Sequence, residues 1–350
     1  MIKFSHQILH ALVFAVLCCS GCATHQAQGP IEEAGWISLG GIEQWVTIRG
    51  DDQRNPILLH VHGGPGFAAS AFVEEFAPYE SDFTVVQWDQ RGAGRTFGRY
   101  GEETPEVTLD RVAQDGIELA ENLRTRFAGR PVIIFGHSLG TLIGIDMVKR
   151  APNRFAAYVG TAQFSNFQDA VKAQIAYLRS IGEAKGDAAL LAQIDAIQLS
   201  DPISLQEFFA VNRILASYVP LDDKAWFSRM QARFPEVMTS VELAIWSAGR
   251  EFSADMIMPQ IIDTNLFATA PRLPIPIIFI QGEKDIYSPT ALAVSYFKQV
   301  DAPDKALVIV KDAAHFPYLT HPQEFLSALR KNVLPLVTKK PTQAVIEELY

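Results

Sequence analysis

The sequence predicts an α/β fold with a mostly parallel central sheet, helices on both faces and an inserted helical cap. Short continuous apolar runs, such as ILLHV (57–61) and VIIF (132–135), are typical of strands buried on both faces of a parallel sheet. These runs alternate with helical patterns, which indicates a doubly wound sheet. The alternation stops between residues 161 and 270, and this long stretch without strand patterns predicts the cap.

The first part of the core, residues 36–160, begins with a predicted hairpin of edge strands at 36–39 and 42–48. Further strands are expected at 57–61, 83–88, 132–135 and 155–159. Helices are expected at 70–79, at 108–127 with Thr108 as the N-cap, and after residue 140.

The cap, residues 161–270, is expected after the sixth strand. Its apolar residues recur at helical spacing, for example at Val171, Ile175, Leu178 and Ile181. The second part of the core, residues 271–338, contains predicted strands at 277–280 and 306–310 and a last helix opened by Pro322. Residues 339–350 are expected to form a peripheral tail.

Composition limits the function classes. Of the 350 residues, 48% are apolar and 20% are charged, which is typical of a globular chain with a large buried core. The formal net charge of −9 and the lack of a long basic block argue against a nucleic-acid partner.

The first 22 residues predict a signal peptide, because one early lysine precedes an apolar run too short to span a bilayer. All three cysteines lie in this segment, so an exported mature domain contains no disulfide. The sequence LCCSGC (17–22) resembles a bacterial lipoprotein box with Cys22 as the lipidated residue, while cleavage after Ala23 by an ordinary signal peptidase is the alternative. We therefore expect a protein of the bacterial cell envelope, lipid-anchored or periplasmic, whose link to the membrane is at most an N-terminal lipid. Residues 23–35 are expected to be a linker.

The sequence GHSLG (136–140) carries the strongest chemical signal. It lies between a predicted strand and a predicted helix, which is the context of a nucleophile elbow. The glycines permit a sharp turn, and the turn exposes the hydroxyl of Ser138 above the sheet. Ser138 is therefore the candidate nucleophile.

An activated serine needs a base, and the base needs an acid that orients it. Asp285 follows the predicted strand 277–280, and His315 follows the predicted strand 306–310. Their order after the serine, acid and then histidine, agrees with the order known for this arrangement. Glu283 and Asp312 are competing acids, but Glu283 lies too close to its strand and Asp312 too close in sequence to the histidine.

A tetrahedral intermediate needs N–H donors for its oxyanion. The amide of Leu139, directly after the nucleophile, is one expected donor. The other is expected from HGGPG (62–66), where Gly63 and Gly64 remain alternatives. The loop DQRGAGRT (89–96) is interpreted as a tight turn braced by an internal ion pair, with a wall of the substrate pocket as the alternative.

These motifs support a resemblance. The Ser138, Asp285 and His315 contexts resemble the α/β-hydrolase fold from residue 36 to about residue 337, and HGGPG with DQRGAGRT resembles the proline iminopeptidase family of serine peptidases. The resemblance implies release of N-terminal residues from short peptides beneath a helical cap, with no metal or organic cofactor.

The chain departs from that family at the elbow, because the family carries GGSWG where this sequence has GHSLG, a form common among esterases and lipases. The resemblance also implies cap carboxylates that bind the substrate ammonium. Glu242 and Glu251, which flank Trp246, are the first candidates, before Glu207 and Glu236.

We expect an exported serine hydrolase acting on a small molecule or short peptide. A proline-iminopeptidase-like aminopeptidase is the first hypothesis and an ester hydrolase the alternative, since the loops favour the former and the elbow the latter. A non-hydrolytic or ligand-binding member of the fold is a further alternative that fold alone does not exclude.

Overall fold

The computed structural model describes residues 29–218 and 220–338. The predicted signal peptide with Cys22 and the predicted tail at 339–350 lie outside these residues. Within the described part of the chain, no helix combines the length and the apolar character that crossing a membrane requires.

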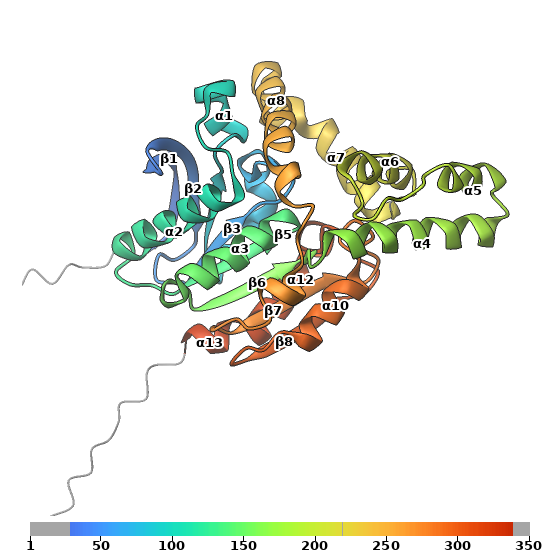
Figure 1. The fold of residues 1–350 in the computed structure, drawn as a ribbon. Coiled ribbons are helices and arrows are strands. Elements are labelled where there is room, and N and C mark those ends of the chain that lie inside the picture. The colour runs from blue at the N-terminus through green and yellow to red at the C-terminus, as the bar shows by residue number, and fades with distance from the viewer. Residues whose placement is uncertain (1–28, 219, 339–350) are drawn as a thin grey trace, which may run out of the picture.

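Eight strands form one sheet in the order β1-β2-β4-β3-β5-β6-β7-β8 (Figure 1). β1 pairs antiparallel with β2 and β2 antiparallel with β4, whereas the remaining neighbours are parallel. The predicted mostly parallel α/β fold is confirmed. The strands are β1 (Ile31–Leu39), β2 (Ile42–Gly50), β3 (Ile57–Val61), β4 (Thr84–Asp89), β5 (Val132–His137), β6 (Ala157–Thr161), β7 (Ile277–Gly282) and β8 (Lys305–Val310).

The edge strand β1 begins at Ile31, before the predicted start at residue 36 and inside the segment expected to be a linker. Its pairing with β2 runs from Ile31 opposite Gly50 to Leu39 opposite Ile42. Glu32 and Glu33 are exposed on this edge, so their charges need no burial. The strand therefore extends to Ile31 through backbone pairing with β2. Such pairing needs no apolar pattern, so the sequence did not predict it.

Helices cover both faces of the sheet (Figure 1). Alternate residues of β5 separate the two faces: Val132 and Ile134 belong to one apolar cluster, and Ile133 and Phe135 to the other. The first cluster includes residues of α2 and α3, and the second residues of η1 and α12. The core helices are η1 (Ala69–Tyr79), α1 (Gly94–Tyr100), η2 (Gly101–Glu103), α2 (Leu109–Arg126), α3 (Leu139–Arg150), η3 (Pro152–Arg154), α10 (Thr290–Gln299), α11 (Pro317–Thr320), α12 (Pro322–Asn332) and α13 (Leu334–Thr338).

Two predicted helix starts are confirmed. The hydroxyl of Thr108 accepts a hydrogen bond from the backbone N–H of Arg111 and so caps α2. Pro322 is the first residue of α12, where its missing N–H costs no helical hydrogen bond.

The insertion between β6 and β7 is helical, as predicted. Its two ends meet where Asn166 forms an antiparallel bridge with Asn265. Figure 1 shows these helices extending from one edge of the core. They are α4 (Phe167–Lys185), α5 (Ala188–Asp195), α6 (Leu205–Leu215), α7 (Leu221–Val237), α8 (Ser240–Ile257), η4 (Met258–Gln260) and α9 (Leu266–Thr269).

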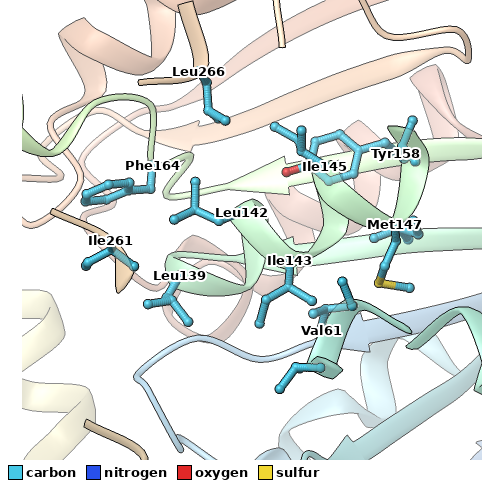
Figure 2. Packing of buried hydrophobic residues seen from close by; sticks show 14 of the residues in the cluster. Val61, Leu139, Leu142, Ile143, Ile145, Met147, Tyr158, Phe164, Ile261 and Leu266 are labelled. Carbon is cyan, nitrogen blue, oxygen red and sulfur yellow. The ribbon is translucent and has the colours of Figure 1, made fainter. Parts of the chain in front are cut away.

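The helix α3 is buried along most of its length, and this burial holds the turn at its N-terminus. Leu142, Ile143 and Ile145 lie in the same apolar cluster as Val61 of β3 and Ile261 of the insertion (Figure 2). Sheet and cap residues thus confine the helix from several sides.

Candidate active site

Ser138 occupies a strained turn between β5 and α3. β5 ends at His137, α3 begins at Leu139, and Ser138 itself has φ 53° and ψ −124°. A positive φ is unusual for a residue with a side chain and persists only where the surroundings enforce it. The predicted strand–turn–helix context of the GHSLG motif is therefore present, and Ser138 remains partly exposed.

Close backbone approach explains the glycines around this turn. A Cβ atom on Gly140 would lie 2.7 Å from the carbonyl oxygen of His62, and one on Gly136 would lie 3.0 Å from the carbonyl oxygen of Gly140. A Cβ on Gly63 would lie 2.9 Å from the Cβ of Ser138. The elbow and the HGGPG loop are thus packed directly against each other, and a Cβ at Gly140 or Gly63 would require the backbone to move.

His315 and Asp285 lie together at the ends of β8 and β7. The Nδ1 atom of His315 is 3.0 Å from each carboxylate oxygen of Asp285. The same carboxylate accepts hydrogen bonds from the backbone N–H groups of Tyr287 (2.9 Å) and Ser288 (3.0 Å). These bonds fix the acid, and the acid in turn orients the imidazole.

The negative charges around His315 raise the pKa of its imidazole. Burial by itself lowers the pKa of His315, but the negative charges of Asp285 and Asp223 outweigh that effect and hold the pKa above its ordinary value. A base with such neighbours can accept a proton and keep it during a reaction step.

Asp223, from α7 of the cap, is a residue that sequence reasoning missed. One carboxylate oxygen accepts a hydrogen bond from the backbone N–H of His315 at 2.9 Å, while the other is buried with no partner among the described residues. Burial raises the pKa of Asp223. Its sequence context, LDDK at the start of a helix, is typical of an exposed surface, so no local signal identifies it.

Ser138 and His315 line the same cavity, of about 380 Å³. Leu139 and Gly64, two of the predicted oxyanion donors, also line it, whereas Gly63 packs behind the elbow. The lining is strongly apolar and includes six phenylalanines: Phe67, Phe164, Phe208, Phe209, Phe227 and Phe316. Among the described lining residues there is one arginine, Arg250, and no aspartate or glutamate.

The predicted cap residues lie outside the lining of this cavity. Glu242 caps the start of α8 together with Thr239 and forms an ion pair with Arg95 at 2.9 Å. Glu242 and Trp246 line a separate cavity between α1 and α8. The indole N–H of Trp246 donates to the carbonyl of Ala68, and Glu251 is exposed on α8.

The two loops that resemble proline iminopeptidases are linked through His62. Its Nε2 atom accepts a hydrogen bond from the backbone N–H of Gln90 (3.4 Å), and the side-chain amide of Gln90 donates to the carbonyl of His62 (3.2 Å). The HGGPG loop and the DQRGAGRT loop therefore form one unit beneath the cavity.

Neither arginine of the DQRGAGRT loop forms the ion pair expected inside that loop, since Arg95 pairs with Glu242 of α8. Arg91 instead pairs with Asp115 of α2, with both side chains fully buried and Nη2 2.9 Å from Oδ1. Asp89 accepts hydrogen bonds from the backbone N–H of Arg95 and from the hydroxyl of Ser70. The prediction of an internal pair was wrong because α2, a separate element, places its carboxylate directly against the guanidinium.

No group of three or more histidine, cysteine, aspartate or glutamate residues within 29–218 and 220–338 is arranged to hold a metal ion.

Comparison with known proteins identifies a family and a curated relative to which the chain is similar. A sequence profile of the alpha/beta hydrolase family matches residues 58–328. The probable aminopeptidase YbaC of Bacillus subtilis is 26% identical over 302 residues, which cover 85% of this chain and 94% of YbaC.

Solved structures share the fold. The proline iminopeptidase-related protein TTHA1809 from Thermus thermophilus aligns with a TM-score of 0.60 at 19% identity, covering 88% of this chain and 99% of its own. A thermophilic esterase from Thermogutta terrifontis aligns with a TM-score of 0.54 at 16% identity, covering 88% of this chain and 99% of its own. These likenesses and the family profile confirm the predicted α/β-hydrolase fold, which the chain shares with a proline iminopeptidase-related protein.

Proposed function

The chain belongs to the alpha/beta hydrolase family, and on that premise we propose that it is a serine hydrolase that forms an acyl-enzyme at Ser138. The observation that carries the proposal is the arrangement of three side chains. Ser138 sits at a strained elbow, it lines one cavity with His315, and His315 is hydrogen-bonded to the buried Asp285.

The proposed reaction has two halves. The hydroxyl oxygen of Ser138 attacks the carbonyl carbon of the substrate while the imidazole of His315 takes the hydroxyl proton, and that proton then passes to the departing oxygen or nitrogen. Water, deprotonated in the same way, releases the acyl group and returns the proton to Ser138. The charge of Asp285 stabilises the imidazolium in both halves.

The oxyanion is proposed to bind the backbone N–H of Leu139 and that of Gly64. Leu139 is the first residue of α3, where the N–H groups have no partner within the helix. Gly64 is favoured over Gly63 because Gly64 lines the cavity. Both donors are backbone groups held by packed structure, so little reorganisation is needed in the transition state.

The cavity favours carboxylic esters with an apolar acyl or alkyl group. An aminopeptidase has to hold the ammonium group of its substrate, yet the described lining contains no carboxylate, and Asp223 is fully buried behind it. Phe209 lines the cavity and is still 46% exposed, so apolar surface continues to the solvent. Aminopeptidase activity is the second candidate, favoured by the similarity to YbaC over 85% of the chain.

Purified protein should be assayed with p-nitrophenyl butyrate and with proline β-naphthylamide, and labelled with a fluorophosphonate probe. We expect Ser138→Ala to abolish ester turnover and labelling, while Ser295→Ala, an exposed serine on α10, leaves both unchanged. Labelling that persists in Ser138→Ala would contradict the proposed nucleophile. Faster turnover of the amide than of the ester would favour the aminopeptidase.

A further inference from the structure

A lone arginine faces the cavity that contains Ser138 and His315. Arg250 projects from α8 and is one of the lining residues. Its guanidinium carbon lies 4.9 Å from the ring centroid of Trp246 and 5.4 Å from that of Phe67. Two aromatic rings therefore hold the guanidinium in place, and Arg250 is exposed to solvent.

Arg250 has no anionic partner among the described side chains. No carboxylate lies within ion-pair distance of it, and its neighbour Glu251 acts on it only through its charge. Some other arginines on the surface do have such partners. Arg95 pairs with Glu242, and Arg179 pairs with Asp195.

The cavity removes only part of the hydration of this cation, because Arg250 is exposed to solvent. Burial lowers the pKa of Arg250, because the apolar cavity removes part of its hydration. An arginine nevertheless stays protonated at neutral pH, so the cavity carries one positive charge. An exposed cation that lines an apolar cavity and has no anionic partner among the described side chains is available to bind an anionic ligand.

We propose that Arg250 binds an anionic group, a carboxylate or a phosphate, on the substrate whose carbonyl Ser138 attacks. The planar guanidinium matches the oxygen pairs of both groups. The phenylalanine lining accommodates an apolar body, so the preferred substrate is an amphiphilic ester with one anionic end. This inference rests on the proposed hydrolase function and names the substrate class of the same site.

The test compares matched esters. One is p-nitrophenyl butyrate, and the others are the mono-p-nitrophenyl esters of succinic, glutaric and suberic acid, which add a carboxylate at increasing distance from the reacting carbon. Arg250→Met keeps the apolar stem but removes the charge, and Arg250→Lys keeps the charge without the planar fork. Arg99→Met is the matched control, because Arg99 is also exposed and stacks on a tryptophan, Trp36, but lies outside the catalytic cavity.

We expect Arg250→Met to lower the ratio of kcat/KM for the best anionic ester over that for the butyrate ester by about ten- to hundredfold. The change should come mainly from KM, Arg250→Lys should restore part of the ratio, and Arg99→Met should leave it unchanged. Competitive inhibition by hexanoate and by hexyl phosphate, with hexanol as the neutral control, distinguishes the two anions, and the inhibitor that loses more potency in Arg250→Met identifies the preferred group.

A ratio in Arg250→Met within about twofold of the wild-type ratio, with unchanged inhibition by both anions, overturns the inference. Fluorophosphonate labelling of Arg250→Met at the wild-type rate shows that its elbow is intact. A separate result tests the proposed hydrolase function: ester turnover that remains in Ser138→Ala would contradict it.

Discussion

Acid should destabilise this fold through His62, which joins the HGGPG loop to the DQRGAGRT loop. The side chain is 1% exposed, with Nδ1 3.0 Å from the carbonyl oxygen of Gly63 and Nε2 accepting from the backbone N–H of Gln90. This accepting role requires a neutral ring. Burial lowers the pKa of His62 from 6.5 to about 4, against a smaller opposite effect from the hydrogen bond to Gly63.

The sign and size of the effect follow from linkage. Above pH 6.5 the ring is neutral in both the folded and the unfolded chain, so the full stability is present. As the pH falls below 6.5, His62 of the unfolded chain binds a proton, whereas His62 of the folded chain binds one only near pH 4. The free energy of unfolding therefore decreases between pH 6.5 and about pH 4. Lowering the pKa from 6.5 to about 4 is worth about 3 kcal/mol at low pH, and most of this stability is lost by pH 4.5. That is a large part of the ~5–15 kcal/mol that typically stabilises a domain.

Urea unfolding of the wild type and His62→Gln at pH 7 and pH 4.5 measures this loss. At pH 7 the variant should be less stable by about 1 kcal/mol, because one hydrogen bond is lost. Between the two pH values the difference in unfolding free energy should move by roughly 2 kcal/mol in favour of the variant. His60 and His137 are present in both proteins, and their pKa values are lowered mainly by burial, with a smaller effect from the charge of His62. A difference that moves by less than about 1 kcal/mol would refute the reasoning.

Three other predictions concern the site and the N-terminus. Asp223→Asn removes a negative charge that raises the pKa of His315, so the acid limb of the kcat/KM profile for p-nitrophenyl butyrate should move to lower pH; an unmoved limb contradicts the role of Asp223. Gly140→Ala should cost about 3 kcal/mol or more in unfolding free energy, because its Cβ would overlap backbone carbonyls of the β3 loop. Gly35→Ala, with no atom within 4 Å of its added Cβ, is the control, and equal melting temperatures for the two variants would refute the packing argument. Cys22→Ser should move the protein from the membrane fraction to the soluble fraction of the cell envelope if Cys22 carries a lipid; equal distribution of wild type and variant would favour ordinary signal cleavage.

Local patterns were enough to predict the central sheet and the placement of the proposed catalytic residues. An apolar run buried on both sides, a glycine-bounded serine after it and a helical pattern beyond it act over fewer than about twenty residues, so each element carries its own signal. Asp285 and His315 could be placed because loops that follow parallel strands meet at one edge of the sheet. His315 and Asp285 are indeed hydrogen-bonded there.

The contacts of the cap were decided only in three dimensions. An amphipathic pattern says which face of a helix is buried but not which surface it covers, so α7 and α8 carry no sequence signal that Asp223 contacts the backbone of His315 or that Arg250 lines the cavity. The sequence did not predict the partner of Arg91 for the same reason, because Asp115 contacts it from a separate helix. The sequence alone therefore determined which side chain the elbow presents, while the packing of distant segments decided the charge and shape of the cavity beside it.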